Sequence, residues 1–336
     1  MGRGVMRLSR RQLLRGAVAC APAVLSPRIA LAQRTVRVAM LHTGADTPEF
    51  RASPVWQGFL RSLREAGYDE KRNLALDLYA VDGRNERFAE FATAAIGKKA
   101  DVIIAHSTPA ARAAMAATAT TPIIAVNISD PVAAGLVTSL ARPGGNVTGV
   151  ANQSADLIGK FFQVLGQVVP GLKRVGYLLN PSNPGHVNHV RDLESAGSRI
   201  GVTVSSAEVR RAEDFGEAFA RFARRDVRGL IVFGDALIRQ NATRIIDLAK
   251  QHRIVAIYQF AIFADLGGLM SYGPRLSHIF HRAGALTGRV LNGARPGDLP
   301  FEQPSEFDFV VNLRTATAAG ISMPPTLMLS ATRVIE

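Results

Sequence analysis

Short polar segments follow the apolar runs of this sequence, and their side chains could bind a small ligand. In the first half they are His42-Thr43-Gly44, His106-Ser107-Thr108 and Asn127-Ile128-Ser129-Asp130. In the second half they are Asn180-Pro181-Ser182-Asn183, Gly234-Asp235, Tyr258-Gln259 and Ser271-Tyr272. Polar residues also follow strands simply because they cap helices and lead into loops. As a group, however, they suit hydrogen bonds to a small zwitterion or carboxylate, with Asp130 or Asp235 available for an ammonium group.

Motifs of catalysis and of metal binding are weak in this chain. It contains no phosphate-binding G-x-x-x-x-G-K-[ST] loop, no dinucleotide-binding G-x-G-x-x-G turn and no G-x-S-x-G nucleophile elbow. Two histidine pairs, His186 with His189 and His278 with His281, have helical spacing but lack carboxylates or cysteines at the spacings of metal sites. We therefore expect solvated or capping histidines, and predict no catalytic residues, no metal and no cofactor.

The N-terminus has the pattern of an export signal. An arginine pair, Arg10-Arg11, is followed by Leu13-Leu14, by a mostly apolar run over 17–25 and by the small-residue site Ala30-Leu31-Ala32. This order predicts a twin-arginine-type signal peptide over residues 1–32 and a periplasmic protein. The alternative is a short uncleaved membrane anchor, but the run is well short of the about 20 residues that span a bilayer.

Removing this segment changes the composition. It holds six arginines and no acidic residue, so the formal charge falls from +13 to +7. No block rich in lysine and arginine remains, and we expect no nucleic-acid partner. The only cysteine, Cys20, is also removed, which excludes disulfides, cysteine nucleophiles and thiolate metal sites. The remaining 304 residues suffice for two domains.

Hydrophobic periodicity predicts alternating strands and helices in two similar halves. Strands are expected at 36–41, 74–79, 101–105, 123–126, 174–179, 202–204, 229–233, 255–258, 268–273 and 307–311. Helices are expected at 54–66, 84–97, 109–119, 154–169, 187–201, 213–224, 241–252, 276–291 and 313–319. The alternation predicts an α/β protein with two doubly wound, Rossmann-like lobes, with Trp56 in the core. Such sheets bind ligands beyond the carboxyl ends of their strands.

The stretch DPVAAGLVTSLARPGGNVTGV, residues 130–150, lies between the two halves. We expect a short helix over 132–140 and a turn over 142–146. The run at 147–150 is then expected to be the first crossover into the second lobe. The stretch would be both cleft rim and hinge.

Several segments in this order resemble one family. They are Gly67-Tyr68, Asn73-Leu74, residues 130–150, LLNPSNP at 178–184, AIYQ at 256–259, GGLMSYG at 267–273 and PSEFDFVVNLRTATAAGISMPP at 304–325. The chain resembles ABC-transporter substrate-binding proteins, a family that includes tryptophan/tyrosine-type uptake receptors. The resemblance implies a type I periplasmic binding-protein fold with a multi-crossover hinge. Lobe one is expected at 33–148 and 274–300, and lobe two at 149–273 and 301–336.

The resemblance also implies a function and a site. The protein would capture a small amino-acid-like or carboxylate solute, aromatic in some relatives, and deliver it as a monomer to an ABC permease in the inner membrane. The ligand-binding residues would be Thr43, His106, Ser107, Thr108, Asn127 and Asp130 in lobe one, and Asn180, Asn183, Asp235, Tyr258 and Tyr272 in lobe two. The alternatives are a periplasmic sensor subunit and a secreted enzyme on the same fold.

Overall fold

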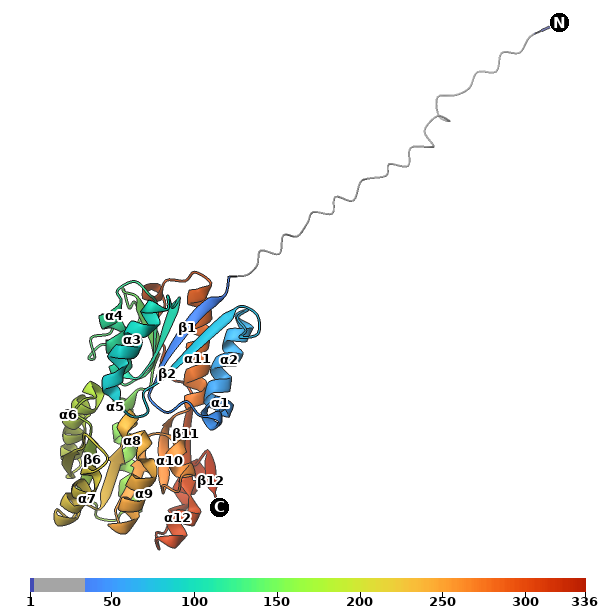
Figure 1. Ribbon diagram of the computed structural model, residues 1–336. Helices are drawn as coiled ribbons and strands as arrows, with labels where there is room; N and C mark the ends of the chain where they lie inside the picture. Colours follow the sequence, from blue (N-terminus) through green and yellow to red (C-terminus); the bar gives the residue numbers. More distant parts are fainter. Residues whose placement is uncertain (3–33) are drawn as a thin grey trace. The chain divides into compact units, whose positions relative to one another are not determined.

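The computed structural model describes residues 1, 2 and 34–336, and its helices and strands lie in the compact unit Thr35–Glu336. Apart from its first two residues, the predicted signal peptide therefore lies outside the described residues. Figure 1 shows the strands as arrows, each flanked by helices. None of the described helices is long and apolar enough to cross a membrane.

The first sheet has five parallel strands in the order β2-β1-β3-β4-β5. They are β1 (Val36–His42), β2 (Leu74–Ala80), β3 (Val102–His106), β4 (Ile123–Ile128) and β5 (Val147–Ala151). Helices α2 (Pro54–Glu65) and α11 (Leu276–Leu291) cover one face, and α3 (Phe88–Gly97) and α4 (Thr108–Ala117) the other. The central strands are mostly apolar because both of their faces are covered, and polar residues occur mainly at their ends. Trp56 is 2% exposed, which confirms its predicted place in the core.

The second sheet has seven strands in the order β12-β11-β10-β9-β8-β6-β7, with only β11 antiparallel to β10. They are β6 (Arg174–Leu179), β7 (Thr203–Glu208), β8 (Gly229–Val232), β9 (Val255–Tyr258), β10 (Met270–Pro274), β11 (Phe307–Asn312) and β12 (Arg333–Ile335). One face packs on α5 (Ser154–Val168), α6 (Pro184–Arg199), α12 (Leu313–Ala318) and α13 (Pro325–Ser330). The other packs on α7 (Asp214–Arg224), α8 (Ala236–Gln240), α9 (Ala242–Gln251) and α10 (Ala261–Asp265).

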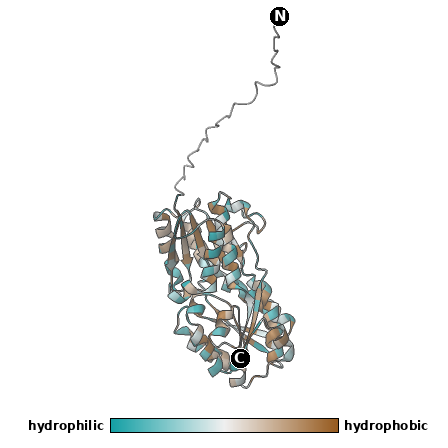
Figure 2. Ribbon diagram, turned by 90° about the vertical axis from the view of Figure 1, so that its right-hand side faces the viewer, coloured by the Kyte–Doolittle hydropathy of each residue, from teal (hydrophilic) through white to brown (hydrophobic). Residues whose placement is uncertain are grey.

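We call the first sheet with its helices lobe one and the second sheet with its helices lobe two. The chain crosses between them three times, at 152–153, at Arg275 and at 300–306. Figure 2 shows mainly brown, hydrophobic strands and helices on which teal and brown residues alternate. The predicted α/β architecture of two doubly wound lobes joined by several crossovers is confirmed.

Two predictions for residues 130–150 are wrong. Residues 132–140 form turns rather than a helix, because Asp130 Oδ1 accepts two nearby backbone N–H groups and Gly135 has a positive φ of 68°. The run at 147–150 is part of β5, which pairs with β4, and the chain crosses to lobe two only after Ala151. The third crossover also bonds to the end of β5, because the Ala151 N–H donates to the Glu302 carbonyl at 2.8 Å.

Candidate functional site

The carboxyl ends of β1, β3 and β4 bring three predicted ligand residues of lobe one together. Because these strands are neighbours in the sheet, their last residues lie side by side. His106 Nδ1 lies 3.4 Å from Thr43 Oγ1, and His106 Nε2 lies 3.3 Å from Asn127 Nδ2. His106 Nδ1 also lies 3.2 Å from Nδ1 of His42, a residue outside the predicted set.

The backbone is strained at this edge of lobe one. Ser107 has φ 114° and Asn127 has φ 63°, values that residues other than glycine rarely adopt. Each such residue costs roughly 1–3 kcal/mol and persists only where its surroundings hold it. Ser107 caps α4, and the buried Thr108 is the first residue of that helix. Both residues lie at the ends of β3 and β4, beside the predicted ligand residues His106 and Thr108.

In lobe two the predicted residues Asn180, Asn183 and Asp235 form one cluster. Asn180 Nδ2 donates to Asp235 Oδ1 at 2.8 Å, and Asn183 Nδ2 donates to Asp235 Oδ2 at 3.0 Å. Asp235 Oδ1 also accepts the Leu237 N–H and so caps α8. The carboxylate therefore fixes the direction in which α8 leaves the strand edge.

The lobes are in contact across a small cavity of about 40 Å³. Thr108 and the exposed Asp130 line it from lobe one, and Gly185, His189 and Asp192 line it from lobe two. Contact between the lobes is close nearby, since Ser129 Oγ lies 3.4 Å from Ser154 Oγ. The two lobes therefore contact each other around this cavity, close to the first crossover.

The two predicted tyrosines lie elsewhere. Tyr258 is 1% exposed and its ring stacks on Phe263 at 5.0 Å in the core of lobe two, where burial raises the pKa of the phenol. Tyr272 packs beside Phe307 and under the ammonium group of Lys160. The structure thus does not bring these rings to the Asn180–Asp235 cluster.

Arg239 on α8 is a candidate ligand residue that the sequence reasoning missed. Its side chain is partly buried and makes no hydrogen bond or ion pair with any residue in the described part of the chain. Burial lowers the pKa of its guanidinium, and its charge in turn lowers the pKa values of His42 and His106. The sequence feature that could have identified it is that Arg239 is the only charged residue of α8, the helix that follows the strand-end residue Asp235.

His42 and His106 are neutral at pH 7. Burial, followed by repulsion from His106 and Arg239, holds the pKa of His42 well below its usual value. Burial and then Arg239 lower the pKa of His106 to about 3. The edge formed by His42, Thr43, His106 and Asn127 therefore presents neutral imidazoles, an amide and a hydroxyl, with the guanidinium of Arg239 near it. This set can donate hydrogen bonds to an anionic group.

The expectation of solvated histidines is wrong for the pair on α6. His186 is 1% exposed and His189 is 3% exposed. His186 Nδ1 accepts the Asn180 N–H at 3.3 Å and so supports the polar cluster, whereas the His189 ring packs on Phe233 at 4.2 Å. Among the described residues, no group of three or more His, Cys, Asp and Glu residues is placed to hold a metal ion.

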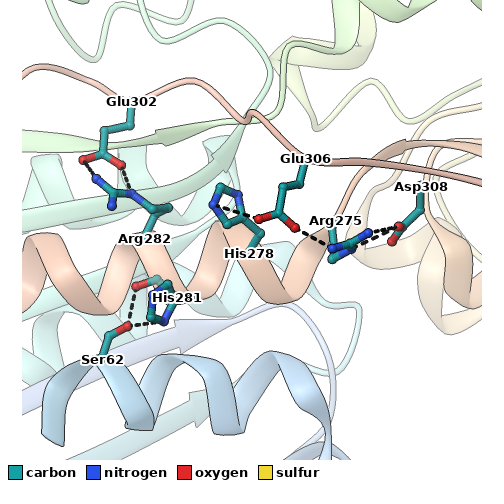
Figure 3. A network of polar contacts seen from close by, with 8 residues as sticks. All are labelled: Ser62, Arg275, His278, His281, Arg282, Glu302, Glu306 and Asp308. Carbon is teal, nitrogen blue, oxygen red and sulfur yellow. Dashed lines mark hydrogen bonds and ion pairs between the residues drawn. The ribbon is translucent and has the colours of Figure 1, made fainter. Parts of the chain in front are cut away.

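A polar network ties α11 to the second and third crossovers (Figure 3). Arg282 forms a bidentate pair with Glu302, with N–O distances of 2.6 and 2.7 Å. Arg275 contacts both Glu306 and Asp308. These contacts join a helix of lobe one to the segment that enters lobe two, which makes them contacts of the hinge.

Two doubly wound lobes joined by three crossovers, with polar residues at facing strand ends, define a type I periplasmic binding-protein fold. A structure from Vibrio cholerae has a TM-score of 0.83 at 25% identity, covering 90% of this chain and 100% of that one. A structure from Streptococcus pneumoniae, an ABC domain in complex with L-Trp, has a TM-score of 0.82 at 23% identity over the same shares.

Sequence comparison shows the family. The model of the ABC transporter substrate binding protein family matches residues 52–335. A "Tyrosine-binding protein" of Clostridioides difficile (strain R20291) is 28% identical over 262 residues, which are 78% of this chain and 75% of that protein. The chain belongs to the ABC transporter substrate-binding proteins, as its sequence motifs predicted.

Proposed function

We propose that this protein captures a small, amino-acid-like solute with a carboxylate group between its lobes and delivers it to a membrane permease. The names of its relatives support this class of solute, since one is called tyrosine-binding and another holds L-Trp. Membership of an ABC transporter family supports the permease as the partner.

The observation that carries the proposal is the unpaired guanidinium of Arg239. A partly buried charge without a partner is costly, and a ligand of opposite charge removes that cost. A carboxylate matches a guanidinium particularly well because it accepts two parallel hydrogen bonds. The neutral state of the neighbouring His42 and His106 leaves Arg239 as the positive charge of this part of the cleft.

An ammonium group on the solute would be accepted by Asp235 or Asp130. The oxygens of Asp235 accept hydrogen bonds from Asn180, Asn183 and a backbone N–H. An ionised carboxylate offers about four lone-pair sites, so a further donor can be accommodated. Asp130 is exposed at the small cavity between the lobes and accepts only backbone N–H groups there.

We also propose export by the twin-arginine route to the periplasm, on the pattern of residues 1–32, and action as a monomer. Because β5 pairs with β4 as far as Ala151, we place lobe one at 35–151 and 275–299 and lobe two at 152–274 and 300–336. The proposed ligand residues are those of the predicted set other than Tyr258 and Tyr272, together with Arg239.

A thermal-shift screen of amino acids and small carboxylates tests the proposal. A solute at about 100 times its Kd adds about 2.7 kcal/mol to the free energy of unfolding. The best solute is then titrated by calorimetry into Arg239→Gln, for which we expect an affinity loss of about tenfold or more. Arg244→Gln, at an exposed arginine on α9, is the matched control. Equal affinities in the two variants would refute the role of Arg239.

A further inference from the structure

A series of buried polar side chains begins in lobe two, and backbone groups fix the orientation of its amides. The Gly234 N–H lies 2.9 Å from Gln259 Oε1, and the Ser154 N–H lies 3.1 Å from Asn152 Oδ1. A backbone N–H can only donate, so in each amide the oxygen faces that group and the NH₂ points onward. Gln259, Ser154 and Asn152 are all at most 4% exposed.

The next bonds carry this direction across the first crossover. Gln259 Nε2 donates to Ser154 Oγ at 2.9 Å, and the Ser154 hydroxyl donates to Asn152 Oδ1. Asn152 Nδ2 then donates to Asn127 Oδ1 at 2.9 Å. Because Asn127 Oδ1 is the acceptor, its own Nδ2 must be a donor. Each link therefore has one possible direction, from lobe two to lobe one.

The same logic fixes the tautomers of the two histidines. Asn127 Nδ2 faces His106 Nε2 at 3.3 Å, so this nitrogen accepts and the neutral ring carries its hydrogen on Nδ1. His106 Nδ1 lies 3.2 Å from His42 Nδ1 and 3.4 Å from Thr43 Oγ1, and a hydrogen on both histidine nitrogens would place two N–H groups against each other at the shorter distance. His42 Nδ1 therefore accepts, and the hydrogen of His42 is on Nε2.

This last donor has no acceptor. His42 is 2% exposed, and its Nε2 is buried without a hydrogen-bond partner among the described residues. A buried donor left unpaired is costly. A Cβ atom built on Gly44 would lie 2.9 Å from His42 Nε2 and 3.8 Å from Arg239 Nε. The nitrogens of both side chains thus lie beside Gly44, on the side where any other residue would carry its Cβ.

We propose that His42 Nε2–H is a second donor to the solute carboxylate beside Arg239, and that the hydrogen-bond chain from Gln259 to His106 sets its hydrogen. This inference rests on the proposed function for the ligand class. We call this series of hydrogen-bonded side chains, which runs through Gln259, Ser154, Asn152, Asn127 and His106, the donor chain. His106 and the other members of the donor chain act as positioning residues, while His42 touches the solute.

The tautomers are measured without any ligand by long-range ¹H–¹⁵N NMR at pH 7. We expect Nε2–H at His42 and Nδ1–H at His106. In Asn127→Asp a carboxylate, which only accepts, faces His106, so both tautomers should reverse. Asn188→Asp adds the same charge on α6 outside the donor chain and should leave both tautomers unchanged. An Nδ1–H tautomer at His42 in the wild-type protein would overturn the inference.

Binding is measured with L-tyrosine against tyramine and with L-tryptophan against tryptamine, pairs that differ by the carboxylate. His42→Phe keeps an aromatic ring against Phe50, which stacks on His42 at 4.1 Å, but removes the donor. We expect it to weaken binding of the amino acids by about tenfold to a hundredfold and to leave the amines unchanged. An equal loss for amino acid and amine would overturn the inference. If the wild-type protein bound no amino acid, the proposed function would fail. The measured tautomers would still show whether the donor chain sets the hydrogen of His42.

Discussion

Mild acid should destabilise this protein because its native state holds neutral, buried histidines. His106 is 6% exposed and His189 is 3% exposed, and burial lowers the pKa of each to about 3. In the unfolded chain the pKa of a histidine is about 6.5. The native state therefore binds fewer protons, so the stabilisation is fully present above pH 6.5 and is lost as the pH falls from 6.5 towards 3.

The magnitude follows from these values. Between pH 6.5 and pH 5 each histidine takes up a proton in the unfolded state but not in the native state. One pKa unit corresponds to 1.36 kcal/mol, so each contributes a loss of about 2 kcal/mol over this interval. Together His106 and His189 give about 4 kcal/mol, a large share of a typical total of about 5–15 kcal/mol. The lowered pKa of Asp214 changes the free energy of unfolding only at more acidic pH.

Urea unfolding at pH 7 and pH 5 measures this loss. Trp56, the only tryptophan, reports unfolding of lobe one by fluorescence, and circular dichroism reports both lobes. His189→Phe retains a ring against Phe233 but cannot titrate, so the loss between pH 7 and pH 5 should be about 2 kcal/mol smaller. His252→Gln, at a partly exposed histidine that ends α9, is the control. A wild-type protein equally stable at both pH values would refute the reasoning, as would an unchanged pH dependence in His189→Phe.

Three further predictions concern packing and the hinge. Gly149→Ala should lower the free energy of unfolding by about 3 kcal/mol or more, because the new Cβ would collide with the Ala125 carbonyl. The control Gly145→Ala, whose Cβ would have no atom within 4 Å, should change it by no more than about 0.5 kcal/mol. Urea unfolding measures both. A double-mutant cycle of Arg282→Gln and Glu302→Gln should give a coupling of about 1 kcal/mol, because the pair is bidentate but partly exposed; zero coupling would contradict its role. Small-angle scattering should show compaction when the solute binds, and an unchanged radius with a tightly bound solute would contradict hinge closure.

The elements that could be predicted from the sequence are those whose pattern is local. Runs such as 101–105 are apolar because neighbouring strands and helices cover both faces, and their length distinguishes them from helices. The run at 147–150 shows the limit, since its β character was visible but its pairing with β4 was not. Parallel partners are set by long-range packing, which no local pattern records. The short helices α8 and α10, of five residues each, carry too few turns for a period.

The site residues were predicted from their positions at strand ends. This prediction is limited because successive side chains of a strand point to opposite faces of the sheet. His106, Asn127 and Asp235 lie where parallel strands end, and the structure brings them to the edges of their sheets. Tyr258 also ends a strand, but its side chain faces the core, and the adjacent Gln259 points into the donor chain instead. A position at the end of a strand places a residue near the site. Whether its side chain reaches the site depends on the face of the sheet on which that side chain lies. Arg239 was missed because it lies a helical turn beyond its strand.

The one-way direction of the donor chain has an evolutionary consequence. Exchanging a single amide for its acid, as in Asn152→Asp, places two acceptors face to face, so that every later link has to reverse. A change at Asn152 would then alter the hydrogen on His42 although Asn127 and His106 lie between them, whereas the backbone N–H of Ser154 keeps the Asn152 amide in place when Gln259 changes. One substitution within the donor chain, such as Asn127→Asp, is therefore enough to remove the hydrogen from His42 Nε2. A lineage that turns this cleft to solutes without a carboxylate can do so without replacing any residue that touches the solute.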